Sequence, residues 1–382
     1  MMERLLPEVC KIQYGYAFDS AKFTTNIGIP LVRIRDVVRG FSETYTTEEC
    51  DKEYIVQNGD ILIGMDGEFN IARWKGGRAY LNQRVCRLTP KIAVDSTYLY
   101  YFMPKALKEI EDKTPFVTVK HLSAKELNKI IVPIRPIEEQ KKIAAELQNI
   151  DKLIELRKQQ LSKLDELVKS RFIEMFGDPM LNPKEWDVVN ISSVIGGKVS
   201  NGFFAKRDDY CDNGNVQVLG VTNIVNRMYS NIEELPKTNG TQSDIEKYGV
   251  KYGDMLFCRS SLVAEGIGKA SIVPSETPNN VLFECHVIRL PLDLDKCVPE
   301  FMQVLSTTDY FRNQIISQSK TATMTTIGQD GILKTDIILP PLDLQKEFLQ
   351  FVEQTDKLKF EVKQSLDKLE TLKKALMQKY FG

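Results

Sequence analysis

The side chains that most often carry acid–base, nucleophilic or metal chemistry are few and scattered in this sequence. The two histidines, His121 and His286, have no carboxylate or cysteine around them at the spacing of metal ligands. His286 follows Cys285 in an apolar, strand-like run, where a structural role is the simpler interpretation. The seven cysteines never form a C-x-x-C pair. The sequence therefore predicts reduced thiols, with no zinc finger and no disulfide framework.

Other catalytic motifs are incomplete or absent. Gly266–Lys269 resembles a phosphate-binding loop but lacks the upstream glycine and the hydroxyl that would hold Mg²⁺. Glu361 and Lys363 form an acidic-x-Lys pair of the kind that nucleases use, yet they lie on an expected long helix, where a solvated face is the better interpretation. No G-x-S-x-G is present, nor an Asn-Pro-Pro-Tyr/Phe motif of adenine methyltransferases. We therefore expect that the chain is not an enzyme by itself.

An internal repeat organises the chain. Residues 136–177 and 341–382 align without a gap at a shift of 205 positions, and 15 of the 42 positions are identical. The regions that precede them match more loosely. Tyr54–Leu62 resembles Tyr248–Leu256, and both contain a Gly-Asp pair before an apolar run. The sequence therefore predicts the order globule, long helix, globule, long helix.

The two repeated segments have the pattern of a coiled coil. Each begins at a proline, continues without Gly or Pro for about 40 residues and ends at a glycine. Apolar residues recur at alternating spacings of four and three, which is a 3.5-residue repeat. The apolar residues expected to pair the helices are Ile143, Leu147, Ile150, Ile154, Leu161, Leu164, Val168, Val352, Val362, Leu366, Leu369 and Leu376. Polar residues also occupy this seam, namely Arg157, Arg171, Thr355, Lys359 and Lys373. The alternative is that each segment is a core helix of a globular domain.

If the helices pair antiparallel, one globule sits at each end and the chain start approaches its finish. The fold class that we expect is therefore α+β, with two globular domains separated by two long helices that form an antiparallel coiled coil, a dumbbell with approximate two-fold symmetry. Short strands are expected in the globules at 29–35, 59–63, 216–221 and 253–257, because turn residues bound apolar runs there.

Composition sets further limits. The chain has 382 residues, 42% of them hydrophobic, which is enough for real cores. No apolar run approaches the length of a membrane span, and Met1–Pro7 lacks the apolar region of a signal peptide. We therefore expect a cytoplasmic protein with no membrane partner.

The net charge is −1, and residues 178–340 carry 15 basic and 20 acidic side chains. Any polyanion site in that region must be a local patch.

These features together resemble the specificity subunit of Type I restriction-modification systems. The resemblance rests on two differing globules that alternate with two near-identical helices, each entered by the Ile-x-x-Pro-x(0–2)-Pro-x-x-x-Gln-Lys pattern. It implies that 1–135 and 178–340 are target-recognition domains and that 136–177 and 341–382 are spacer helices. It also implies a subunit without catalysis of its own. The partners would be double-stranded DNA, two methyltransferase subunits and the restriction/translocase subunits, and S-adenosylmethionine, ATP and Mg²⁺ would bind to those subunits.

The resemblance implies a bipartite, asymmetric DNA site, because the two globules differ in sequence. Helices of about 60 Å suit half-sites roughly one turn of duplex apart. Adenine methylation and restriction by the partners would follow from this recognition. Two other functions remain open at this point: a coiled-coil scaffold that joins two protein-binding domains without touching DNA, and an enzyme with an unfamiliar site.

Candidate DNA contacts follow from residue type, since cations, amides, hydroxyls and aromatic rings are the groups that contact phosphates and base edges. In the first globule they are Arg73, Trp74, Lys75, Arg78, Gln83, Arg84, Lys120 and His121. In the second they are Asn201, Phe203, Lys206, Arg207, Arg259, Ser260, Lys320 and Thr323. Arg73–Arg78 equally fits a solvated turn with Trp74 in the core. The Thr-rich segment around Thr323 equally fits an ordinary loop or strand.

Overall fold

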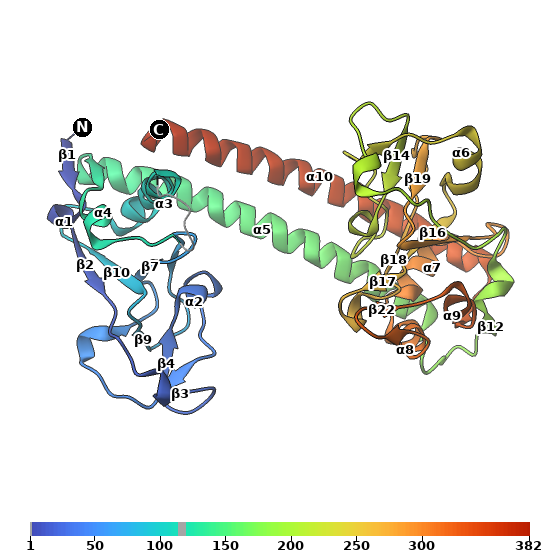
Figure 1. The fold of residues 1–382 in the computed structure, drawn as a ribbon, viewed down its shortest axis with the longest axis horizontal. Helices are drawn as coiled ribbons and strands as arrows, with labels where there is room; N and C mark the ends of the chain where they lie inside the picture. Colours follow the sequence, from blue (N-terminus) through green and yellow to red (C-terminus); the bar gives the residue numbers. More distant parts are fainter. Residues whose placement is uncertain (1, 114–119) are drawn as a thin grey trace. The chain divides into compact units, whose positions relative to one another are not determined.

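The computed structural model describes residues 2–113 and 120–382 (Figure 1). The chain divides into two compact units. Unit 1 comprises Met1–Lys158 and Gln364–Gly382, and unit 2 comprises Gln159–Lys363. Helices α5 (Ile137–Phe176) and α10 (Leu342–Phe381), of 40 residues each, contribute one part to unit 1 and the other part to unit 2.

The long helices begin and end at the signals in their sequences. Acidic residues occupy the first turn of each helix, where they complement the positive end of the helix dipole. Gly177 follows α5 with φ of 79°, and its N–H donates to Ile173 O at 2.8 Å. A side chain at this position would be strained in the left-handed conformation, and its Cβ would lie 2.6 Å from Pro183 Cγ. The helix α5 therefore ends at a position where glycine adopts the left-handed backbone conformation without strain.

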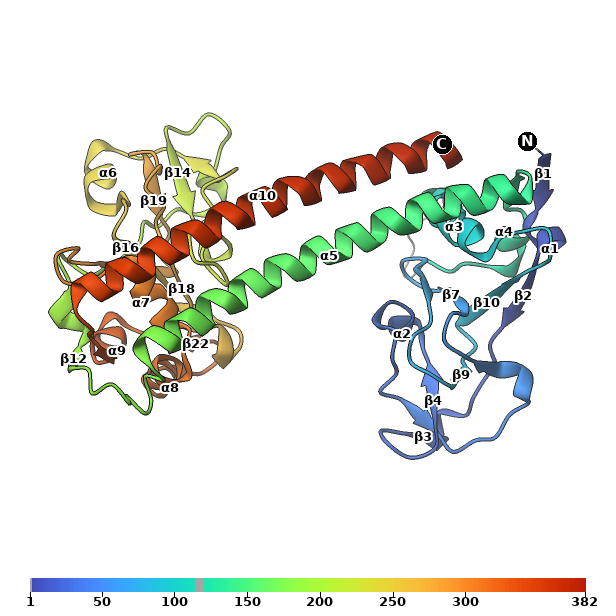
Figure 2. The ribbon, with the colours of Figure 1, turned by 180° about the vertical axis from the view of Figure 1, so that it is seen from behind.

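Within each unit, α5 and α10 run in opposite directions (Figure 2), and ion pairs join them. In unit 1, Lys373 Nζ near the end of α10 lies 2.6 Å from Asp151 Oδ1 near the start of α5. In unit 2, Lys359 Nζ in the first half of α10 lies 2.7 Å from Asp165 Oδ1 in the second half of α5. The seam positions are buried or half-buried, and most flanking positions are exposed. The expected antiparallel coiled coil is thus confirmed.

The globular part of unit 1 contains antiparallel sheets and one parallel pair of strands. Its central sheet has the order β2-β10-β7-β8, and a second sheet has the order β3-β5-β4-β9-β6 with β4 and β9 parallel. The strands are β1 (Met2–Leu5), β2 (Cys10–Tyr14), β3 (Phe23–Thr24), β4 (Ile29–Val32), β5 (Tyr45–Thr46), β6 (Ile55–Val56), β7 (Ile61–Gly64), β8 (Ile71–Arg73), β9 (Ala79–Leu81), β10 (Val85–Pro90) and β11 (Ile131–Ile134). The helices are α1 (Leu6–Val9), α2 (Ile34–Arg39), α3 (Ser96–Lys113) and α4 (Ala124–Asn128). The strand expected at 29–35 ends at Val32, because α2 begins at Ile34 with Asp36 accepting a hydrogen bond from Arg33 N.

The globular part of unit 2 repeats this plan. Its central sheet has the order β13-β20-β16-β18, and β14 and β19 form the parallel pair. The strands are β12 (Val188–Asn190), β13 (Ser200–Asn201), β14 (Val216–Leu219), β15 (Lys237–Thr238), β16 (Asp254–Cys258), β17 (Ser260–Ser261), β18 (Ala270–Ile272), β19 (Val281–Phe283), β20 (Val287–Pro291), β21 (Lys320–Thr321), β22 (Thr325–Thr326) and β23 (Asp336–Ile338). The helices are α6 (Gln242–Tyr248), α7 (Pro299–Ser306), α8 (Asp309–Ser317) and α9 (Gln329–Leu333).

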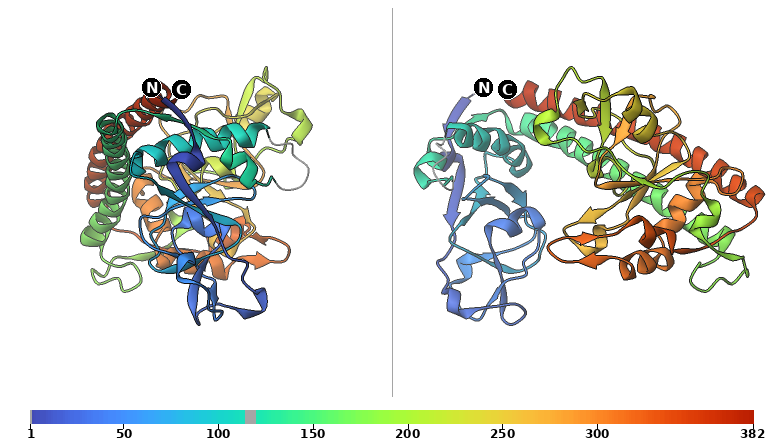
Figure 3. Two further views of the ribbon diagram at one scale, coloured as in Figure 1. Left: turned by 90° about the vertical axis from the view of Figure 1, so that its left-hand side faces the viewer. Right: turned by 45° about the vertical axis from the view of Figure 1, so that its right-hand side comes forward.

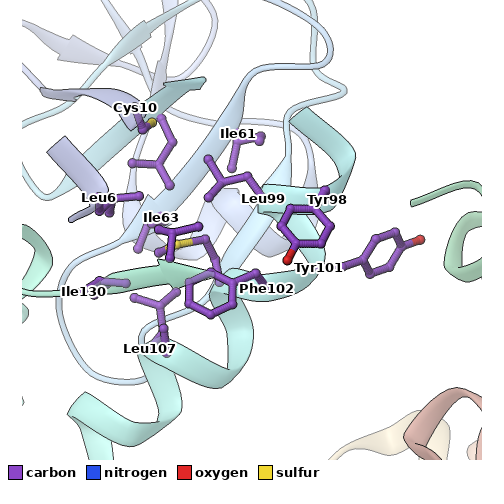
Figure 4. Packing of buried hydrophobic residues seen from close by; sticks show 14 of the residues in the cluster. Leu6, Cys10, Ile61, Ile63, Tyr98, Leu99, Tyr101, Phe102, Leu107 and Ile130 are labelled. Atoms are coloured by element: carbon purple, nitrogen blue, oxygen red, sulfur yellow. The ribbon is translucent and has the colours of Figure 1, made fainter. Parts of the chain in front are cut away.

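The core of unit 1 lies between its central sheet and α3. Figure 4 shows Tyr98 and Phe102 of α3 among the apolar side chains of β7, whereas Tyr101 points away from them. Tyr101 Oη instead donates to Asp151 Oδ2 of α5 at 2.7 Å. The same helix therefore contacts both the sheet and a long helix, and so fixes the globule of unit 1 against its part of α5.

The last phenylalanine of each long helix completes a core. Phe381, at the end of α10, contacts the rings of Tyr98 and Phe102 in unit 1. Phe176, at the end of α5, contacts the ring of Phe301 in unit 2 and is fully buried. Each long helix therefore begins beside the globule that precedes it and ends inside the core of the other unit. In unit 1 this brings the end of α10 close to β1, as both views of Figure 3 show.

Candidate nucleic-acid interface

Three segments of unit 1 meet at one end of its central sheet. They are the loop after β7, the turn between β9 and β10, and the segment before α4. We call their polar residues loop cluster 1, which comprises Asp66, Gln83, Arg84, Lys120 and His121. Asp66 is the centre of this cluster. Its Oδ1 lies 2.5 Å from His121 Nδ1, and its Oδ2 lies 3.6 Å from Arg84 Nε.

Gln83, Arg84 and His121 of loop cluster 1 are exposed to solvent, and Asp66 holds the last two by ion pairs. The Arg84 and His121 side chains are 52% and 48% exposed, whereas Asp66 is 24% exposed. Lys120 is held differently, because its Nζ donates to Glu111 O at 2.8 Å. Gln83 is exposed at the tip of the turn. The cluster thus exposes a guanidinium, an imidazole and an amide, and Asp66 holds the guanidinium and the imidazole in place.

The corresponding segments of unit 2 form loop cluster 2, which comprises Arg259, Ser260, His286, Lys320 and Thr323. Ser260 Oγ lies 2.8 Å from His286 Nδ1, and Arg259 donates to Cys285 O at 3.3 Å. Lys320 and Thr323 are exposed in and beside the β21–β22 hairpin, which pairs with Ser260 and Ser261. This cluster offers an imidazole, hydroxyls and a lysine.

Backbone hydrogen bonds show that the two clusters occupy the same place in the fold. Met65 N donates to Arg84 O in unit 1, and Arg259 N donates to His286 O in unit 2. Leu122 N then donates to Met65 O, and Ile327 N donates to Arg259 O. Equivalent backbone hydrogen bonds therefore carry different side chains in the two units.

The repeated Gly-Asp pair lies at the start of β7 and of β16, at the opposite end of each strand from the loop cluster. Asp60 accepts a hydrogen bond from Gln57 N at 2.9 Å and from Arg87 Nη1 at 3.1 Å. Asp254 accepts one from Lys251 N at 3.0 Å, and burial raises the pKa of its carboxyl. The pair therefore shapes the turn that enters β7 and β16, the strands that lead to the clusters.

The structure places the Arg73–Arg78 segment away from loop cluster 1. Trp74 is 1% exposed in the core, and its Nε1 donates to Gly77 O at 2.6 Å, which corrects the expectation that it contacts DNA. Arg73 donates to Gly59 O and to the hydroxyls of two α3 residues. Lys75 lines a cavity beside α5 and α10, and Arg78 is exposed.

In the 201–207 segment of unit 2, Phe203 is the residue that lies beside the turn of loop cluster 2. Phe203 N donates to Phe283 O at 2.7 Å, and Phe203 forms a bridge with Glu284, two residues before His286. Lys206 and Arg207 are exposed, and Asn201 is half-buried in β13. Phe203 contacts the Tyr248 ring and therefore has a packing role.

Sequence reasoning missed Asp66, which organises loop cluster 1, and it assigned a structural role to His286, which the structure places exposed in loop cluster 2. A signal was present, because the alignment of the Gly-Asp strands places Met65 and Asp66 opposite Arg259 and Ser260. Only the second pair carries a cation, which is why the sequence alone does not mark Asp66 as part of a DNA contact.

Comparison with known proteins identifies the family. The family model of the Type I restriction modification DNA specificity domain matches residues 1–166 and 183–373. The chain belongs to this family. Within it, the chain is 25% identical over 98% of its length to the Type I restriction enzyme EcoBI specificity subunit of Escherichia coli, 84% of which is covered. It is 24% identical over 86% of its length to the Type I restriction enzyme MjaVIII specificity subunit of Methanocaldococcus jannaschii, 79% of which is covered.

Solved structures share the specificity-subunit fold. The S subunit of a Type I restriction-modification system from M. genitalium matches the whole chain with a TM-score of 0.58 at 12% identity, and 96% of that chain is covered. A chain from a structural study of the assembly and conformational transition of the Type I system matches with a TM-score of 0.56 at 14% identity, and 97% of it is covered.

Within residues 2–113 and 120–382, no cluster of three or more His, Cys, Asp or Glu side chains has the geometry of a metal site. No helix of those residues is long and apolar enough to cross a bilayer.

Proposed function

We propose that the chain is the DNA-reading subunit of a Type I restriction-modification complex and that each loop cluster contacts one half of a bipartite, asymmetric site. The observation that carries this proposal is the repetition of one backbone framework with two different sets of exposed polar side chains. A framework that repeats indicates a shared task, and side chains that differ indicate different targets. Arginine in cluster 1 suits guanine, whereas hydroxyls and histidine in cluster 2 suit other base edges.

The partner and cofactor assignments extend this proposal. Two methyltransferase subunits that carry S-adenosylmethionine would act on adenines beside the site, and restriction/translocase subunits that carry ATP and Mg²⁺ would act on unmodified DNA. This chain would bind none of these cofactors and would catalyse no step. The complex would work in the cytoplasm, where the DNA and the reduced thiols expected of the seven cysteines are found together.

Mapping of adenine methylation across the host genome, with and without the gene for this chain, tests the proposed function. We expect one interrupted motif, with two unlike halves, to lose methylation when the gene is deleted. An unchanged methylation map would contradict the proposal and favour a scaffold that does not touch DNA.

A further inference from the structure

A cationic cleft in unit 2 has no role in the loop clusters. It has a volume of about 760 Å³ and lies between the globule and the unit 2 parts of α5 and α10. The globule contributes Arg227, Lys269 and Arg312, and the helices contribute Lys169, Lys359 and Lys363. The acidic residues that line it are Asp165 and Asp356. We call this the unit 2 cleft.

Most of its positive charge is not neutralised by the chain. Among these six cations, Lys359 alone forms an ion pair within the described residues, with Asp165 at 2.7 Å and Asp356 at 3.4 Å. Lys269 Nζ donates to the Asn226 side-chain oxygen at 2.7 Å. The remaining cations therefore give the cleft an excess of positive charge that attracts anions.

Arg312 gives an independent indication of an anionic ligand. Its guanidinium is half-buried and donates to two main-chain oxygens, Glu265 O and Ile267 O, at 3.2 and 2.6 Å. Among the residues that the structure describes, its buried Nη1 has no hydrogen-bond partner. Desolvation by burial lowers the pKa of this guanidinium. A cation kept out of water in this way gains most from a bound anion.

Unit 1 has a matching cleft, built on the same helix positions. Lys158 and Lys374 line it, and they correspond in the repeat to Lys363 and Lys169 of the unit 2 cleft. From the globule it receives Lys75 and Lys105, which occupy other positions in the chain than Arg227, Lys269 and Arg312. A protein partner present in two copies would need the same side chains at both clefts. A phosphate chain needs only an excess of positive charge, and the unit 1 cleft keeps one, because six lysines line it against Asp151, Glu155 and Glu370. Two of these lysines, Lys158 and Lys373, form ion pairs with Glu370 and Asp151.

We propose that the unit 2 cleft binds the sugar–phosphate backbone of the DNA that flanks the bases read by loop cluster 2. The placement supports this, because Lys269 O accepts the hydrogen bond of Cys258 N, two residues before Ser260. Lys269, which lines the cleft, is thus joined by a backbone hydrogen bond to the end of the strand that leads into loop cluster 2. Phosphate contacts contribute affinity without sequence preference, and they position the base-reading side chains. This inference rests on the proposed function.

The test compares the full chain, in complex with its methyltransferase subunits, with the triple variant Arg227→Gln, Lys269→Gln, Lys363→Gln. We measure its dissociation constant for the methylated motif and for unrelated duplex DNA between 50 and 200 mM salt. Each lost phosphate contact lowers the slope of log affinity against log salt by about 0.9. We therefore expect a slope smaller by about 2–3, weaker binding to both duplexes and an unchanged ratio between them. The control variant, Lys198→Gln with Lys334→Gln, removes two exposed lysines of unit 2 outside the cleft and should keep the slope within about 0.5.

The outcomes separate this inference from the proposed function. If the wild-type complex shows no salt-dependent DNA binding, the proposed function itself fails. If the wild type binds DNA with a steep slope and the triple variant matches the control, the cleft proposal is overturned. It is also overturned if the triple variant loses its methyltransferase subunits while DNA affinity per assembled complex is unchanged, since the cleft would then be a protein contact.

Discussion

Gln140 and Gln345, which are 205 residues apart, make the same junction in the two units. The side-chain oxygen of Gln140 accepts a hydrogen bond from Asp95 N at 3.0 Å, and that of Gln345 accepts one from Val298 N at 2.9 Å. Both glutamines are fully buried, and both amide nitrogens donate to a carbonyl just before their own helix. The repeated Pro-x-x-x-Gln pattern thus fixes the start of each long helix to a helix of its globule.

Replacement of Gln345 by methionine should destabilise unit 2. Methionine fills a similar volume but leaves Val298 N and Pro340 O without partners, at about 1–3 kcal/mol for each buried group. Chemical denaturation of the full chain measures the free energy of unfolding. Gln354→Met, on the exposed face of the same helix, should change it by less than about 0.5 kcal/mol. Equal effects of the two variants would contradict the role assigned to Gln345.

Charges placed in the seam should separate the helices. Leu161 and Leu164 are half-buried on the inner face of α5, and an aspartate at either position would lose its hydration there. We expect the double variant Leu161→Asp, Leu164→Asp to lose both helix pairing and assembly with the methyltransferase subunits. Circular dichroism measures the first effect and sedimentation measures the second. Leu167→Asp, at a position 47% exposed on the same helix, should leave both intact. Assembly of the double variant with normal affinity would show that the seam is wrongly placed.

The fragment 178–382 should form an antiparallel homodimer, because its helix is complementary to itself. Lys373 pairs with Asp151 and Lys359 pairs with Asp165 in the full chain. The repeat places Asp356 and Glu370 where α5 has those two aspartates. A second copy of α10 would therefore offer each lysine a carboxylate and cover the apolar seam, which would otherwise cost about 1.5 kcal/mol or more for each large side chain.

Sedimentation of the 178–382 fragment gives its mass, and footprinting with the methyltransferase gives its DNA site. We expect a dimer that recognises a palindrome built from one half-site. Glu370→Lys in the fragment should weaken the dimer, because Lys359 would then face a like charge. A stable, soluble monomer of the unmodified fragment would contradict the self-complementarity of α10.

Glu300 should make the stability of unit 2 depend on pH. Burial raises the pKa of this carboxyl, although the hydroxyls of Tyr229 and Tyr252 donate to it. The folded state therefore holds the proton more tightly than the unfolded chain, and stability falls as pH rises from the ordinary pKa of a carboxyl through the raised value. Above that pH range, Glu300 is ionised in the folded state, and the burial of its charge lowers the free energy of unfolding.

Glu300→Gln should remove this cost, because an amide oxygen still accepts from both tyrosines and carries no charge. We expect the variant to be more stable than the wild type at neutral pH and equal to it in acid, as followed by thermal unfolding between pH 4 and 8. Glu233→Gln, an exposed residue of the same cavity, should show no such pH-dependent difference. A variant less stable than the wild type at neutral pH would contradict the argument.

The helices were predictable from sequence, whereas the loop clusters were not. The 3.5-residue repeat and the shift of 205 positions locate α5, α10 and their seam, because helix periodicity is local information. The sequence also showed that Gln140, Gln345, Phe176 and Phe381 recur, but not which groups they contact. Asp66 meets Arg84 and His121 across 18 and 55 residues, and only the pairing of β7 with β10 brings these loops together. Trp74 appeared suited to DNA because glycines and cations surround it, yet its indole fills a core that short strands leave open.

We propose that two equivalent loop clusters read two different half-sites. Adenine methylation mapped in hosts that carry the wild type, Arg84→Ala or His286→Ala tests it most directly. We predict that Arg84→Ala relaxes base preference in one half of the motif and His286→Ala in the other half, with the spacing between the halves unchanged. Each lost base contact should cost about 1–3 kcal/mol of discrimination. A motif unchanged by both variants, or relaxed in the same half by both, would contradict the claim.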